Sequence, residues 1–403
     1  MKEIIPAKRT EKIQYAIRDV AVEAQRLEGQ GKKIIYLNIG DPLKYDFETP
    51  KHLIEAVEKN WKKSSSYADS LGLKEAREAI ANEAKRNGLN VDYNDVVLTS
   101  GGSEGITMAL GALLNPGDNV LTPKPGYPLY NAVINYFDGI ENEYELDEDN
   151  NWLPDIEDMR RKINEKTKAI VLINPNNPTG AIYSKKQLKE IVDLAAENDL
   201  PIFSDETYDK ILLDDDKFYS VGSLTDEIPV LTFNTLSKNY LCPGWRVGWT
   251  IFSGYIEKRS KFQEAFNQLA RARLSISHPM QYAVKPALEG SQKHLNDMIT
   301  KLRKRRDLTY KRLNEIPYIS LVKPRAAFYA FPKIDLTNFD FKDDKEFVLN
   351  LLKEEHVLFV HGSGFGQKEN TNHFRVVFAA SEEALEKGYN KLETFVKRHL
   401  IEK

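Results

Sequence analysis

One lysine follows an apolar run of the sequence and is the first candidate for chemistry. Lys238 lies in residues 234–248, directly after the β-prone run 229–233. A strand over that run would carry Lys238 beyond its carboxyl end, where open α/β sheets bind ligands. A lysine among small hydroxyl residues at such a place can form a Schiff base. Taken alone, the position fits an ordinary surface lysine in a loop better, so its context has to decide.

Two other strand ends carry polar residues. Asp205 ends the apolar run 201–204, where a lone carboxylate is costly unless it is paired, and a helix N-cap is its ordinary alternative. Residues 100–105 follow a predicted strand and open a helix, so their backbone N–H groups and the helix dipole would face an anion. Two glycines before a helix are weak evidence by themselves.

The elements that must position these residues alternate along residues 50–255. Short apolar runs rich in β-branched residues alternate with helical patterns, which indicates right-handed βαβ units around a mostly parallel sheet with both faces covered. The predicted helices are 51–62, 73–88, 103–114, 127–136 and 185–197, and the predicted strands are 96–99, 119–122, 169–173, 201–204, 230–234 and 247–252.

The regions on either side of this alternation have a different pattern. Before it, a helix near 15–27 and a strand at 33–37 indicate an arm. After it come two long polar helices at 257–290 and 291–313, short strands at 320–322, 327–331 and 374–377, and helices at 344–355 and 382–398. We expect the basic string 301–306 to be distributed over a solvated helix face.

These patterns predict three parts of the chain. We expect an N-terminal arm and part of a small domain at 1–48, a large domain at 49–288 and a small α+β domain at 289–403. No spacer rich in Gly or Ser separates the two domains, so they should pack together. A cleft between them is the expected ligand site.

Composition restricts the partners. The 403 residues hold 57 Lys+Arg against 60 Asp+Glu, so there is no basic field for nucleic acid or anionic lipid, and a small-molecule partner is favoured. No run approaches the ~20 apolar residues of a membrane span. The single cysteine, Cys242, cannot form an internal disulfide, so we expect a cytoplasmic protein.

Common site motifs are missing from the sequence. The seven histidines lack the spacing of metal ligands, so we expect no metal site, and there is no G-x-x-x-x-G-K-[ST] phosphate loop. The Gly-rich run 362–366 does not fit G-x-G-x-x-G and predicts a turn.

Three motifs together resemble one enzyme family. Arg246 stands eight residues after Lys238, residues 174–180 are N-P-N-N-P-T-G, and residues 204–208 are S-D-E-T-Y. In this order and at these separations they resemble the class I and II aminotransferases of fold type I, which use pyridoxal 5'-phosphate. Residues 15–19 resemble the alanine aminotransferase group most. The resemblance covers nearly the whole chain and implies an α/β large domain with a mostly parallel seven-stranded sheet between helices.

The resemblance assigns catalytic roles. Lys238 would hold the cofactor as a Schiff base and then move a proton between the amino-acid Cα and the cofactor. Asp205 matches the carboxylate that keeps the ring nitrogen protonated. Tyr208 and Asn177 match the residues that hydrogen-bond the phenolic oxygen. Tyr127 matches the aromatic that stacks on the ring, with a core tyrosine as the alternative.

It also assigns the phosphate site. Gly102 and Ser103 match the cradle at the helix N-terminus, Arg246 would clamp the phosphate, and Thr235 and Ser237 would supply hydroxyls.

Tyr67 resembles the tyrosine that reaches the phosphate of the neighbouring subunit. This implies a homodimer whose active sites are shared across the interface.

For the substrate, the resemblance points to Arg375 as the residue that binds the α-carboxylate, with Gly40 and Asn177 beside it. Tyr15 and Arg18 are further candidates, and Arg18 would serve part of the role of a second carboxylate-binding arginine. Arg271 or Arg273 could instead stand there.

The activity that the resemblance implies is transfer of the amino group of an L-amino acid to 2-oxoglutarate by ping-pong half-reactions, and we expect alanine to be that amino acid. An aspartate or aromatic aminotransferase is the nearest alternative. A pyridoxal-phosphate lyase and a regulator that keeps the fold without turnover are more distant alternatives. Such a regulator would be expected to carry an added DNA-binding module, and no helix-turn-helix segment precedes residue 50 in this sequence.

Overall fold

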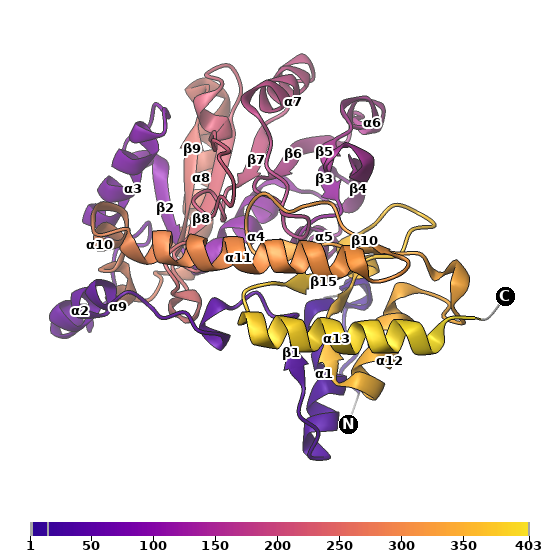
Figure 1. Ribbon diagram of the computed structural model, residues 1–403. Coiled ribbons are helices and arrows are strands. Elements are labelled where there is room, and N and C mark those ends of the chain that lie inside the picture. Colours follow the sequence, from indigo (N-terminus) through magenta and orange to yellow (C-terminus); the bar gives the residue numbers. More distant parts are fainter. Residues whose placement is uncertain (1–2, 14–15, 402–403) are drawn as a thin grey trace.

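The computed structural model describes residues 3–13 and 16–401, with residues 17–19 as backbone only. An eight-stranded sheet forms its centre, in the order β2-β9-β8-β7-β6-β3-β4-β5 (Figure 1). The strands are β2 (Val96–Thr99), β3 (Asn119–Lys124), β4 (Ile140–Asp147), β5 (Leu153–Pro154), β6 (Thr167–Ile173), β7 (Ile202–Asp205), β8 (Val230–Thr235) and β9 (Gly248–Ser253).

The sheet is mostly parallel, as predicted. Strands β4, β3, β6, β7 and β8 run parallel to one another, and β9 lies antiparallel between β8 and β2. The family resemblance implies seven strands, and the structure adds the two-residue strand β5 at the edge next to β4. Strand β4, with the sequence I-E-N-E-Y-E-L-D, was not predicted, because its residues are mostly polar and its first half is exposed or half-buried.

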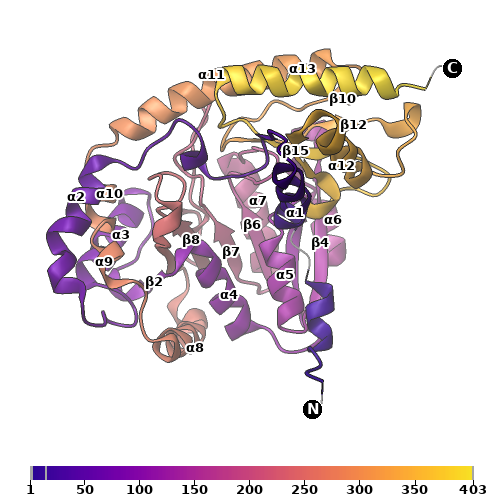
Figure 2. The same cartoon turned by 90° about the horizontal axis from the view of Figure 1, so that it is seen from below.

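Helices cover both faces of this sheet (Figure 2). On one face lie α4 (Gly101–Leu113), α5 (Leu129–Tyr136) and α8 (Ile256–Arg273), and on the other lie α6 (Ile156–Lys162) and α7 (Lys185–Glu197). Within β6, Val171 packs toward α4 and α5, whereas Ile170 and Leu172 pack toward α7. Burial on both faces explains why the parallel strands are continuous apolar runs.

A third cluster closes the sheet beside β2 and β9. It is formed by α2 (Lys51–Asn60), α3 (Lys74–Arg86) and α10 (Val284–Glu289). The single helix predicted over 257–290 is wrong. Helix α8 ends at Arg273, because the next residue, Leu274, has a φ of 84° that is incompatible with a helix. Helix α9 (His278–Gln281) then begins with Pro279 in its first turn.

The C-terminal residues build a separate apolar core with the small sheet β11-β15-β14. Its strands are β11 (Tyr329–Ala330), β14 (Val360–His361) and β15 (Phe374–Val377), and its helices are α11 (Lys293–Glu315), α12 (Asp344–Glu355) and α13 (Glu382–His399). Two further pairs are β10 (Ile319–Ser320) with β12 (Lys333–Ile334), and β1 (Ile35–Tyr36) with β13 (Val357–Leu358). The last pair attaches the N-terminal segment to this core.

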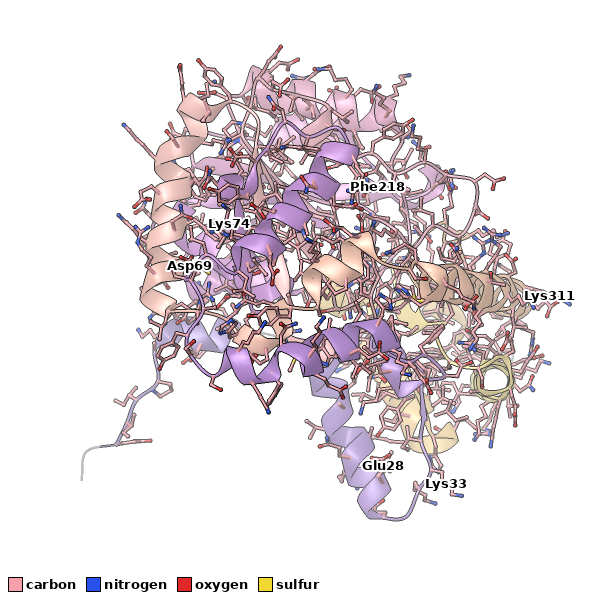
Figure 3. All side chains as sticks on the ribbon, turned by 90° about the vertical axis from the view of Figure 1, so that its left-hand side faces the viewer. Glu28, Lys33, Asp69, Lys74, Phe218 and Lys311 are labelled. Carbon is pink, nitrogen blue, oxygen red and sulfur yellow. The ribbon has the colours of Figure 1, made fainter. Side chains whose placement is uncertain are left out.

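Helix α1 (Ala16–Gly29) begins against the turn after β14, where a Cβ on Gly364 would collide with Ala16. Figure 3 shows its far end, marked by Glu28, and the following turn to Lys33 protruding from the rest of the molecule.

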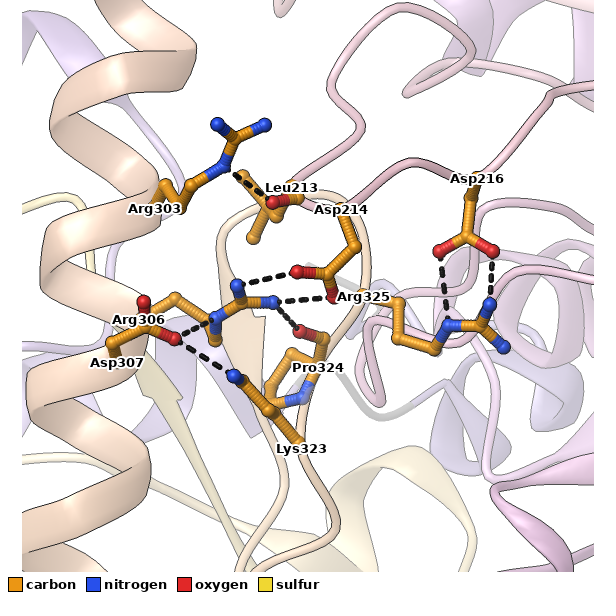
Figure 4. A network of polar contacts seen from close by, with 9 residues as sticks. All are labelled: Leu213, Asp214, Asp216, Arg303, Arg306, Asp307, Lys323, Pro324 and Arg325. Carbon is orange, nitrogen blue, oxygen red and sulfur yellow. Dashed lines mark hydrogen bonds and ion pairs between the residues drawn. The ribbon is translucent and has the colours of Figure 1, made fainter.

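The expectation of a solvated basic string on α11 is wrong for two residues. Arg305 and Arg306 are only 2% and 1% exposed. Arg306 binds both carboxylate oxygens of Asp214 at 2.8 and 2.9 Å and the Pro324 carbonyl at 2.7 Å (Figure 4). A buried guanidinium requires such partners, and only the folded chain brings them together. The string therefore anchors α11 to the loops at 213–216 and 323–325.

Candidate active site

A cavity of about 550 Å³ lies beyond the carboxyl ends of β6, β7 and β8. The register Ile173↔Asp205↔Phe233 aligns these three ends, and the neighbouring loops and β15 complete the walls. The predicted site residues that line it are Gly40, Gly102, Ser103, Tyr127, Asn177, Asp205, Tyr208, Thr235, Ser237, Lys238, Arg246 and Arg375.

Lys238 follows β8 and extends its amine into this cavity. Its Nζ donates a hydrogen bond to the Gly40 carbonyl at 2.6 Å. Burial lowers the pKa of Lys238 to about 8, and the positive charges of Arg375 and Arg246 act in the same direction, against the attraction of Asp41. With this pKa, roughly a tenth of the amine is unprotonated at pH 7 and able to act as a nucleophile or base.

Asp205 ends β7 at the bottom of the cavity and is 6% exposed. Its oxygens accept from the Thr207 N–H at 3.2 Å and the Tyr130 hydroxyl at 3.4 Å. Burial nevertheless raises the pKa of Asp205. The Thr207 bond resembles a cap, yet residues 207–210 form a turn and no helix follows, so the N-cap alternative does not explain this carboxylate.

Arg375 lies on β15, on the opposite side of the cavity, and is 1% exposed. Its Nη1 donates to Asn177 Oδ1 at 3.1 Å and its Nη2 to the Asn38 carbonyl at 2.8 Å. A buried guanidinium fixed in this way is suited to bind a carboxylate bidentately. Because Asn177 Oδ1 accepts from Arg375, the amide nitrogen of Asn177 is its remaining donor.

Two tyrosines form a pair beside these groups. The hydroxyls of Tyr208 and Tyr329 lie 2.7 Å apart, and both residues line the cavity. Burial raises the pKa of Tyr208 well above its usual value, so its hydroxyl stays protonated and can donate.

The other end of the cavity is built for an anion. Helix α4 begins at Gly101 without a side-chain cap, so its first N–H groups are available to a ligand. Gly101 has a φ of 74°, and a Cβ there would collide with the Arg246 guanidinium. A Cβ on Gly248 would come within 2.6 Å of the Gly102 nitrogen. Glycine at both positions therefore lets the helix N-terminus, β9 and Arg246 approach closely.

Two hydroxyls lie near this end. Thr235 Oγ1 donates to the Val247 carbonyl at 2.7 Å and lies 2.8 Å from Ser237 Oγ. Since Thr235 gives its one hydroxyl proton to Val247, Ser237 is the donor in the bond between the two hydroxyls.

Comparison with known proteins identifies this arrangement. Residues 32–392 match the family model for aminotransferase class I and II. The chain belongs to the class I and II aminotransferases. It is 44% identical to the glutamate-pyruvate aminotransferase AlaA of Haemophilus influenzae over 391 residues, 96% of each chain.

Solved structures of aminotransferases are also similar to this chain. The alanine aminotransferase from Pyrococcus furiosus is 46% identical with a TM-score of 0.95, covering 98% of this chain and 100% of that one. The aspartate aminotransferase from Thermotoga maritima is 29% identical with a TM-score of 0.86, covering 97% and 100%.

Membership of this aminotransferase family makes the chain a transaminase that depends on pyridoxal 5'-phosphate. The residues present fit that cofactor. The uncapped α4 N-terminus and Arg246 suit its phosphate, and the buried carboxylate of Asp205 suits its ring nitrogen. Lys238 offers an amine of lowered pKa to its aldehyde.

Some predicted residues of this aminotransferase lie elsewhere. Tyr67 is 79% exposed and does not line the cavity. Tyr15 lies outside the described residues, and Arg18 is described only as backbone of α1, whose Ala21 lines the cavity. Arg271 pairs with Glu264 on the surface, and Arg273 binds the carbonyls of residues 70 and 98, so neither lines this chain's own cavity.

Three residues of the site were not identified from the sequence. Tyr329 carries a hydroxyl on an otherwise apolar strand, which was an available signal. Asn38 binds through its backbone carbonyl, so no side-chain pattern could reveal it. Tyr130 is 1% exposed on an amphipathic helix and has the pattern of a core residue, although its hydroxyl reaches Asp205. Among the described helices, none combines the length and apolar character of a membrane span.

Proposed function

We propose that this aminotransferase exchanges the amino group between alanine and 2-oxoglutarate, giving pyruvate and glutamate in two half-reactions. The observation that carries the proposal is one cavity holding both a weakly basic amine, Lys238, and a buried guanidinium, Arg375. Relatives at 40 to 44% identity are named glutamate-pyruvate or alanine aminotransferases, which supports alanine. A relative named aspartate aminotransferase is 36% identical.

Within this proposal Arg375 and Lys238 act on the substrate. Arg375 binds the α-carboxylate, and Asn177 and Asn38 keep its guanidinium in place. Lys238 Nζ takes a proton from the substrate Cα and later returns one, which a pKa of about 8 permits. Gly40, whose carbonyl binds Lys238 Nζ, lies beside the carboxylate, with Tyr15 and Arg18 as further substrate contacts.

The remaining residues act on the cofactor. Bound pyridoxal phosphate supplies an electron-accepting ring that stabilises negative charge at the substrate Cα. Asp205 keeps a proton on the ring nitrogen, Tyr127 packs on the ring, and Tyr208 and the amide of Asn177 donate to the phenolic oxygen.

For the phosphate, Gly102 and Ser103 donate from the start of α4, and Arg246 clamps it. Ser237 and Thr235 add hydroxyl groups to this end of the site.

The assembly is part of the proposal. We propose a homodimer in which Tyr67, exposed in one chain, reaches the phosphate site of its partner. We also propose that residues 49–288 form the cofactor-binding domain, and that 1–48 and 289–403 form the part that closes over substrate. The buried free thiol of Cys242 fits a protein of the reducing cytoplasm.

The test is an absorption titration of the cofactor-loaded enzyme with alanine, aspartate and tyrosine in turn. We expect alanine to convert the pyridoxal spectrum to a pyridoxamine spectrum at the lowest concentration and 2-oxoglutarate to reverse it. Preference for aspartate or tyrosine would reject alanine as the donor. No spectral change with any amino acid would reject the transaminase activity itself.

A further inference from the structure

The turn between β14 and β15 lies where several parts of the molecule meet. The Gly-rich run at 362–366 folds as a short 3-10 helix, Gly362–Phe365, followed by Gly366 with a φ of 68°. The predicted turn is thus present, and it contacts the site. The Gly126 N–H donates to the Phe365 carbonyl at 2.8 Å, directly before Tyr127.

Phe365 packs directly on the guanidinium of Arg375. Arg375 Cζ lies 4.6 Å from the centroid of the Phe365 ring and 4.6 Å from that of Tyr329. Phe365 is 3% exposed, and Phe331 supports its ring edge-on at a centroid distance of 6.0 Å. The guanidinium therefore contacts two aromatic rings and has polar partners at its Nη atoms.

This arrangement restricts the guanidinium in two different ways. The acceptors Asn177 Oδ1 and Asn38 O fix the positions of the two Nη atoms. The rings favour the positive charge over their faces and limit how the guanidinium can tilt. Bidentate binding of a carboxylate requires the correct plane, so the loss of one ring would weaken binding without removing a hydrogen bond.

A buried carboxylate holds this turn in place. Asp344, 1% exposed at the start of α12, accepts from Ser363 N at 2.6 Å, Ser363 Oγ at 2.9 Å and Gln367 Nε2 at 3.1 Å. His361 Nδ1 lies 2.7 Å from the same Ser363 hydroxyl. These bonds fix both ends of the segment from which Phe365 projects.

We propose that Phe365 is a positioning residue, which holds the Arg375 guanidinium in the plane that binds the substrate α-carboxylate, and that Asp344 holds Phe365 there. This inference rests on the proposed function in one respect, namely that Arg375 binds the carboxylate. It adds a role for the Gly-rich turn and for α12, neither of which touches the reacting atoms.

The test uses Phe365→Leu with two matched variants. Phe365→Tyr keeps the ring, and Phe359→Leu removes a ring from the neighbouring C-terminal core, where Phe359 is fully buried and stacks on Phe374 at 5.0 Å. We expect F365L to raise the KM of the amino acid and of the 2-oxo acid by about tenfold each, with kcat changed less than about threefold. In F365Y and F359L, both KM values and kcat should remain close to those of the unchanged enzyme.

A second measurement does not depend on turnover. Propionate carries the carboxylate of alanine without its amine, so calorimetric titration of the cofactor-loaded protein with propionate reports the carboxylate site alone. We expect the Kd of propionate to rise about tenfold in F365L and to rise also in Asp344→Asn. An unchanged propionate Kd in F365L, or an equal rise in F359L, would overturn the proposal.

The two proposals fail differently. An enzyme inactive with every amino acid, but with propionate binding weakened by F365L, would reject the transaminase function and keep the role of Phe365. Normal alanine turnover by the unchanged enzyme, with propionate binding unaffected by F365L, would keep the transaminase function and reject the role of Phe365.

Discussion

Lys238 Nζ and the Gly40 carbonyl oxygen are 2.6 Å apart, although their residues are separated by 198 positions in the sequence. The contact brings the N-terminal segment to the end of β8, within the cavity that Arg375 also lines. Because a carbonyl accepts from either protonation state of the amine, it orients Lys238 without fixing its charge.

Replacing Lys238 with Ala should abolish catalysis. We expect kcat to fall by about 10² to 10⁴-fold or more, because the general base is lost. Steady-state assays with alanine and 2-oxoglutarate give the rate, and borohydride reduction followed by denaturation tests whether cofactor stays covalently attached. Lys217→Ala, a lysine outside the cavity, is the control. Full activity in K238A would contradict the assignment.

The capture of pyridoxal phosphate by the cofactor-free protein should depend on pH through Lys238. Only the unprotonated amine reacts with an aldehyde, and burial lowers its pKa to about 8, so the rate should rise with pH and level off above about 8. Stopped-flow absorbance measures this midpoint. Since Asp41 raises the pKa of Lys238, Asp41→Asn should move the midpoint to lower pH. A midpoint near the ordinary lysine value would refute the prediction.

Asp205→Asn should affect stability and activity in opposite directions. Burial raises the pKa of Asp205, so the folded protein holds this proton more tightly than the unfolded chain. That contribution to stability is present at low pH and is lost as pH rises through the folded pKa. The cofactor-free D205N variant should therefore melt about 1 to 3 °C higher at pH 7, while kcat falls by about 10²-fold or more. A calorimetric scan in which D205N melts at a lower temperature than the unchanged protein would contradict this prediction.

Arg246→Ala should weaken cofactor binding. A hydrogen bond to a charged group contributes about 1.5 to 3 kcal/mol, so the Kd of pyridoxal phosphate should rise by about 10- to 100-fold. Fluorescence titration of the cofactor-free protein measures it. Arg271→Ala, which removes an exposed arginine paired with Glu264, should leave the Kd unchanged. If both substitutions raised the Kd equally, the protein's net charge would explain the weaker binding, and a direct contact between Arg246 and the phosphate would not.

Subunit mixing should reveal whether Tyr67 acts in the partner's site. In a hybrid of a K238A chain and a Tyr67→Ala chain, a shared arrangement leaves one site with both residues intact and the other with neither. We expect the mixed sample to be more active than either parent after reassociation. If Tyr67 serves its own chain, both sites of the hybrid stay defective and mixing restores nothing.

Local pattern was sufficient for much of the fold. Residues 344–355 were predicted as a helix and form α12 over that same range, because its apolar positions repeat at helical spacing. The strand ends near Asp205 and Lys238 were also found, because Asp205 directly follows a continuous apolar run and Lys238 comes shortly after another. The partly polar strand β4 and the break after Leu274 were missed, because neighbouring elements determine both.

The sequence by itself determined the chemical groups of this aminotransferase, since the spacing of Lys238, Arg246 and the N-P-N-N-P-T-G segment is a property of the chain. The tertiary structure decided their surroundings. Burial lowers the pKa of Lys238, the register of β7 places Asp205 beside Ile173, and Arg375 comes to lie over two rings from separate segments. Each of these depends on contacts between distant residues, and such contacts exist only once the chain has folded.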